Sequence, residues 1–231
     1  MLNNLHEVEV FFGWIEKKIE EIDTITNEPF RRILLLALLD TLAKSAFPKD
    51  KPGKRFVKLI DSYSGWLHSD RVCLIQLRYL LESQVQTECA DLKIEVEMRL
   101  GKWPPKGIGR IPWSREVDPE SVDLCAFKKG RGAALIEKAR YPFLLWEMRN
   151  FAIHELRTIG LALPDSDDFE EPYYFAPLNL ETSSRTWGLN FPTKVISTIV
   201  LNCSEKLKLH FEQKGINPFR DFTDEPGWYL H

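Results

Sequence analysis

Apolar side chains recur at helical spacing over most of this 231-residue chain. Residues 5–23 repeat them every three or four positions, with Glu and Lys on the other face, which predicts an amphipathic helix. A second helix is predicted from Asn27, a typical N-cap residue that is followed by Pro29. Residues 30–46 are apolar on nearly every side, so we expect this helix to be central. Thr193 opens a last helix that ends at Gly215. Residues 92–98 alternate and fit either a strand or a helix.

Residues 101–132 interrupt this pattern. Gly and Pro are frequent there and break regular structure, so a long irregular insertion is expected. The insertion is basic, with Lys102, Lys106, Arg110, Arg115, Lys128, Lys129 and Arg131 interleaved with Trp103 and Trp113. Such a segment binds RNA when the indoles stack on bases and the cations contact phosphates. Alternatively, it is a solvated charged loop whose Trp side chains pack on the body.

Composition limits the class of protein. With 44% hydrophobic residues the chain can bury a substantial core, and we expect one domain over 1–231 with its core at about 28–214. No apolar run reaches membrane-spanning length, and the N-terminus lacks the features of a signal peptide. Four scattered Cys residues indicate neither a zinc site nor a disulfide framework, so a cytoplasmic protein without metal or cofactor is predicted. The net charge of −3 restricts nucleic-acid binding to a local basic patch.

The most informative segment is residues 143–157, an apolar helix that carries Arg149, Asn150 and His154. On a helical wheel Arg149 and His154 lie on the two flanks of the core face, about 140° apart. Between them, away from the core, lie Trp146 and Ile153, which should not face water as a patch. We expect another element to cover this strip, and a second subunit would do so as a homodimer interface.

The run from Arg149 to His154 resembles the signature of the HEPN family (higher eukaryotes and prokaryotes nucleotide-binding): an Arg, a polar residue that is often Asn, then His, near the end of an apolar helix. The resemblance implies an all-α, up-and-down bundle, here with an extra N-terminal helix and long insertions. It also implies a metal-independent ribonuclease whose active site is shared across a two-fold dimer. A prokaryotic toxin or antiviral-defence role is implied as well, with an antitoxin or regulatory partner that restrains cleavage.

The chemistry follows from the residue types. An imidazole suits acid–base transfer, so His154 would act at the ribose 2′-hydroxyl or the leaving 5′ oxygen, which gives 2′,3′-cyclic phosphate and 5′-hydroxyl ends. Arg149 would stabilise charge on the phosphoryl oxygens, and Asn150 would orient the imidazole or the phosphate. Two alternatives stay open: a non-catalytic module that binds nucleotide or RNA, and a dimeric regulatory scaffold in which Arg149 and His154 join the subunits.

Overall fold

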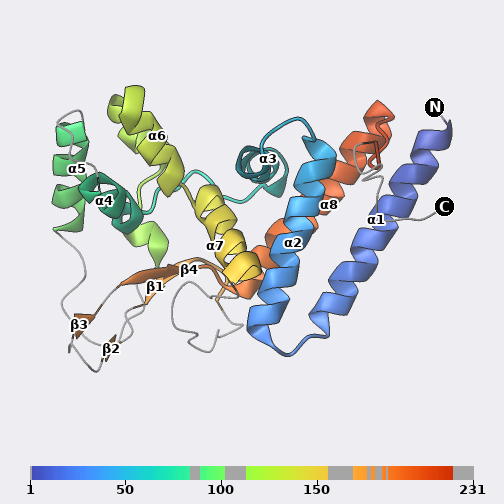
Figure 1. The fold of residues 1–231 in the computed structure, drawn as a ribbon, viewed down its shortest axis with the longest axis horizontal. Helices are drawn as coiled ribbons and strands as arrows, with labels where there is room; N and C mark the ends of the chain where they lie inside the picture. The colour runs from blue at the N-terminus through green and yellow to red at the C-terminus, as the bar shows by residue number, and fades with distance from the viewer. Residues whose placement is uncertain are drawn as a thin grey trace. The chain divides into compact units, whose positions relative to one another are not determined.

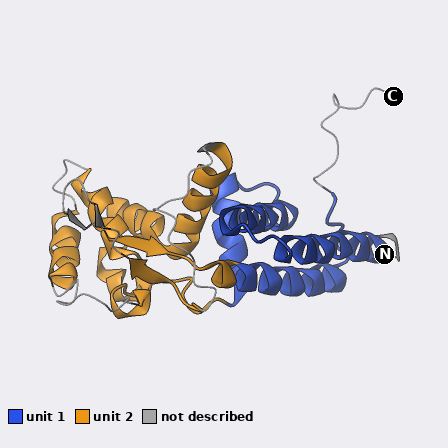
Figure 2. Cartoon of the chain, turned by 90° about the horizontal axis from the view of Figure 1, so that it is seen from below, with its two compact units in different colours: residues 1–65, 197–231 blue, residues 66–196 orange. Residues whose placement is uncertain are grey.

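The computed structural model describes residues 2–83, 89–101, 113–155, 169–175, 178–179, 184–185 and 187–220. Of these, 73% lie in helices and 6% in strands, which confirms the predicted all-α class. Figure 1 shows the helices and the short strands, labelled β1 to β4. Where one domain was expected, the chain divides into two compact units, residues 1–65 with 197–231 and residues 66–196 (Figure 2). No helix in the described ranges combines the length and the apolar character that a membrane span needs.

The first unit is a set of packed helices: α1 (Leu2–Asp23), α2 (Glu28–Ala46), α3 (Pro52–Leu59) with the π-helical turn η1 (Ile60–Ser64), and α8 (Thr193–Lys214) from Ser197 on. The predicted cap is confirmed, since the Asn27 side chain accepts a hydrogen bond from the Phe30 amide. Phe12 of α1 packs edge-on against Phe211 of α8, with ring centroids 6.0 Å apart. The helix with Arg149 and His154 belongs to the second unit.

The second unit contains α4 (Leu74–Glu82), α5 (Ala90–Leu100), η3 (Ser114–Glu116), η4 (Ser121–Phe127), α6 (Gly130–Ala139) and α7 (Tyr141–Glu155). Two strand pairs accompany them, β1 (Tyr173–Phe175) with β4 (Gly188–Asn190) and β2 (Leu178–Asn179) with β3 (Ser184–Arg185), both antiparallel. One apolar core joins α4, α5 and α6 through residues such as Leu77, Val96 and Ile136. The 92–98 stretch is therefore helical.

The predicted insertion is more regular in its described part than its composition suggests. From Trp113 onward it forms η3, η4 and the first turn of α6, because Pro119 and Gly130 stand at the ends of these elements and not inside them. Residues 102–112, with Lys102, Trp103, Lys106 and Arg110, lie outside the described residues. The basic character of 113–132 is thus carried on short helical turns.

Two helical glycines give a direct test of this packing. A Cβ on Gly13 of α1 would meet nothing within 4 Å, whereas a Cβ on Gly132 of α6 would lie 2.5 Å from the Phe127 carbonyl oxygen. Gly13→Ala should therefore raise the free energy of unfolding by about 0.5–1 kcal/mol through helix propensity. Gly132→Ala should lower it by about 1–3 kcal/mol because the backbone must shift. Denaturant unfolding followed by circular dichroism measures both; stabilisation by Gly132→Ala would contradict the packing of α6.

Candidate functional site

The start of the motif helix is fixed by backbone contacts around one residue. Arg140 is extended between α6 and α7 and forms a backbone bridge with Val72. The Tyr141 amide donates to the Arg71 carbonyl (3.0 Å), and the Cys73 amide donates to Ala139 (2.9 Å). The helix therefore begins at Tyr141. A Pro in the first turn loses no intrahelical hydrogen bond, which suits Pro142 there.

On α7 the predicted Arg149 and Asn150 lie together, and Trp146 joins them. The Arg149 guanidinium donates from Nη1 to Asn150 Oδ1 at 3.2 Å. Its Cζ also lies 5.1 Å from the centroid of the Trp146 ring, within the range of a cation–π contact. All three side chains are partly exposed. The cation is therefore held in one orientation at a surface that solvent reaches.

His154 lies apart from this group. It is exposed one residue before the described end of α7, and no hydrogen bond or ion pair joins it to Arg149 or Asn150 in the described ranges. Ile153, beside it, is partly exposed. Because His154 comes five positions after Arg149 on the helix, the two side chains leave the axis about 140° apart. One copy of the helix does not direct both at a single phosphate.

All four described basic residues of the 113–132 segment are exposed, and two of them have defined polar contacts. Arg115 Nη1 forms an ion pair with Glu171 Oε1 at 2.8 Å, and Lys128 Nζ donates to Ser121 Oγ at 2.8 Å. Lys129 and Arg131 are exposed at the start of α6.

Trp113 is placed as in the packing alternative. Its ring lies edge-on to Phe169 with centroids 5.4 Å apart, and its backbone forms a bridge with Tyr173. It is partly exposed. These contacts make Trp113 a packing residue, and any stacking on a base would use its remaining exposed surface.

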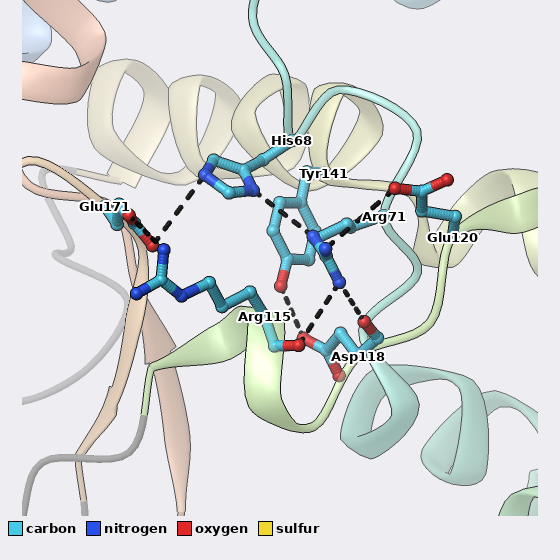
Figure 3. Close-up of polar contacts among 7 residues, drawn as sticks. All are labelled: His68, Arg71, Arg115, Asp118, Glu120, Tyr141 and Glu171. Carbon is cyan, nitrogen blue, oxygen red and sulfur yellow. Dashed lines mark hydrogen bonds and ion pairs between the residues drawn. The ribbon is translucent and has the colours of Figure 1, made fainter.

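A second polar group, which the sequence did not reveal, is buried around Asp118 (Figure 3). The carboxylate accepts hydrogen bonds from the Leu74 amide (2.9 Å), from Tyr141 Oη (2.5 Å) and from Tyr174 Oη (2.7 Å). Cys73 Sγ lies 3.2 Å from Tyr174 Oη. One side chain thereby joins the first turn of α4, the first residue of α7 and β1. No spacing or motif marks these residues, which lie far apart in the sequence.

An outer layer of charged groups surrounds this carboxylate. Arg71 Nη1 donates to the Asp118 carbonyl, and its Nε donates to His68 Nδ1 at 3.2 Å. Because an Arg cannot accept, His68 is the acceptor, and in its neutral form the proton sits on Nε2, which lies 3.9 Å from Glu171 Oε2. Burial lowers the pKa of His68, although Glu171 opposes the effect. Figure 3 shows that this series of polar contacts continues from His68 through Glu171 to Arg115.

Burial sets the protonation of the inner group. It raises the pKa of Asp118 to about 7 against the lowering effect of its hydrogen bonds, and it raises the pKa of Cys73 to about 12. The pKa values of Tyr141 and Tyr174 are also raised, chiefly by burial. Asp118 is 2% exposed and both tyrosines are fully buried, so a substrate does not reach them. We therefore assign the group to positioning α7, not to catalysis.

No protein-family model matches this chain, and neither a curated protein nor a solved structure matches it. Within the described ranges, no cluster of three His, Cys, Asp or Glu side chains is arranged to hold a metal ion. We therefore infer a function from the geometry of α7 and of the residues around it.

Asp118 predicts a pH dependence of stability. The folded state holds its proton more tightly than the unfolded chain, whose Asp has a pKa near 3.8, so the free energy of unfolding should fall as pH rises from about 4 to about 7. Asp118→Asn, which cannot ionise, should reduce this slope. Denaturant unfolding across the pH range measures it, with Glu97→Gln on the exposed face of α5 as control. Equal slopes for Asp118→Asn and the unmodified chain would show that the pKa of Asp118 is not raised in the folded state.

Proposed function

We propose that this protein is a HEPN-type endoribonuclease whose α7 supplies a metal-independent cleavage site. The observation that carries the proposal is the orientation of Arg149 by Asn150 and Trp146, together with an exposed His154 farther along the same helix. A fixed guanidinium suits the planar recognition of phosphoryl oxygens. An imidazole that solvent reaches suits proton transfer to and from RNA.

The 140° between Arg149 and His154 makes a composite site the more economical arrangement. In a two-fold dimer that pairs two copies of α7, Arg149 of one copy and His154 of the other would face one phosphate. Trp146 and Ile153, each partly exposed in the single chain, lie between these flanks and would form the contact. Lys129 and Arg131, exposed at the start of α6, would add phosphate contacts along the RNA.

The proposed setting is the cytoplasm, in a toxin or defence system with a restraining partner. All four cysteines are free thiols, which suits a reducing compartment. This setting rests on the motif and on thiol chemistry, and the cleavage assay tests the enzyme independently of it.

We expect the purified protein to cleave RNA in the presence of a chelator and to leave 2′,3′-cyclic phosphate ends. Arg149→Ala and His154→Ala should each reduce cleavage about a hundredfold or more, the scale of one acid–base or charge-stabilising group. Gel analysis of end-labelled RNA measures the rate and the ends. His210→Ala, in α8, is the matched His control and should retain activity. Activity that vanishes with chelator and returns with magnesium would require a different mechanism.

The composite site also predicts complementation. Trp146→Asp or Ile153→Asp should convert a dimer to monomers, because each places a charge at an apolar contact. Sedimentation at micromolar concentration measures the mass. If the site is shared, mixing the inactive Arg149→Ala and His154→Ala proteins should restore part of the activity, because a mixed dimer keeps one intact Arg–His pair. A monomeric unmodified protein that still cleaves RNA would refute the shared site.

A further inference from the structure

A second face of α7 borders a cavity of about 650 Å³ that lies wholly within the second unit. Its walls come from α4, α7 and the β1–β4 strand pair with the residues that flank it. Five aromatic side chains line it: Tyr79, Phe151, Phe175, Trp187 and Phe191. The volume is that of a site for a small organic molecule, and the lining is mostly apolar, as in such sites.

The part of α7 that lines the cavity has one charged residue. Leu144, Glu147, Met148 and Phe151 follow the i, i+3, i+4, i+7 spacing of a single helix face, and all four line the cavity. On helical spacing alone, the three apolar members are expected in the core. The structure leaves them partly exposed beside open space.

Glu147 gives this cavity its chemical character. Among the described lining residues it is the one that carries a formal charge; the other polar ones include Gln76 and Asn190. Glu147 is partly buried, and its carboxylate makes no hydrogen bond or ion pair within the described ranges. A partly buried carboxylate beside aromatic rings, without a protein cation paired to it in the described ranges, favours a cationic ligand.

The aromatic rings favour the same ligand. Ring faces attract a cation through their quadrupole, and an aromatic group beside a carboxylate is a recurrent way of binding organic ammonium ions. An anion is disfavoured, because a phosphate or carboxylate ligand would meet Glu147 with no basic side chain among the described lining residues. The cavity is therefore unsuited to the phosphates of a nucleotide.

We propose that this cavity binds an organic cation: an ammonium group that pairs with Glu147, attached to an apolar or aromatic body that contacts the rings. Gln76 and Asn190 would supply hydrogen bonds at its polar end. Asn190 is held for this by the bond from its Nδ2 to Tyr173 Oη, 2.7 Å long. Neither Arg149 nor His154 lines the cavity, and this proposal does not depend on whether the protein cleaves RNA.

The test uses three probes with one carbon skeleton and different charges: 3-phenylpropylamine, 3-phenylpropan-1-ol and 3-phenylpropanoate. Calorimetry and ligand-observed NMR with the full chain near pH 7 measure their affinities. We expect the amine to bind about tenfold more tightly than the alcohol, and the carboxylate to bind weakest. Glu147→Gln should abolish the preference of the amine over the alcohol. Glu147→Lys should reverse the order of amine and carboxylate.

Two controls separate this site from general attraction to an acidic protein. Glu97→Gln, the same substitution on an exposed position of α5 that does not line the cavity, should leave all three affinities unchanged. Circular dichroism establishes that each variant is folded. Absence of saturable binding by the amine would overturn the proposal. Equal affinity for the three probes, or a preference for the amine that survives Glu147→Gln, would overturn it as well.

Discussion

The second unit depends on how one carboxylate is kept out of water. Burying Asp118 is costly, and the cost is offset because the Leu74 amide and the hydroxyls of Tyr141 and Tyr174 all donate to it. Those donors belong to α4, α7 and β1, so the hydrogen bonds can be satisfied only when the three elements meet in one arrangement. Removing any donor leaves the buried carboxylate with fewer hydrogen bonds to offset its burial, which ties the position of α7 to residues far from the motif.

Because Tyr141 is the first residue of α7, fixing it also fixes the direction in which every later side chain leaves the helix. At 100° per residue, the face with Leu144, Glu147, Met148 and Phe151 turns to the cavity. Arg149, Asn150 and Trp146 then lie on another side, and His154 on the flank beyond. One helix thus carries two chemically distinct surfaces, a cationic one suited to phosphate and an acidic, aromatic one suited to an organic cation.

The two surfaces differed in how far the sequence revealed them. Arg149 and His154 stood out because a cation and an imidazole inside an apolar run are unusual, and Asn150 is an adjacent residue on the same helix. Glu147 did not stand out, since an acid in a helix is more often solvated or paired. Its role depends on Tyr79, Phe175 and Trp187, which come from segments that helical periodicity cannot bring together. Asp118 was missed for the same reason.

What the sequence determined alone was local. Periodicity and caps fix where helices form, since backbone hydrogen bonding and side-chain spacing act within a few residues, and the all-α class, the Asn27 cap and the start of α8 at Thr193 followed from them. The tertiary structure decided what each helix faces. Contacts between distant segments decide whether Leu144 and Met148 meet a core or a cavity. They also decide whether Trp113 packs on Phe169 and which groups donate hydrogen bonds to Asp118. Those contacts arise from the joint packing of all the elements, so no single stretch of the chain encodes them.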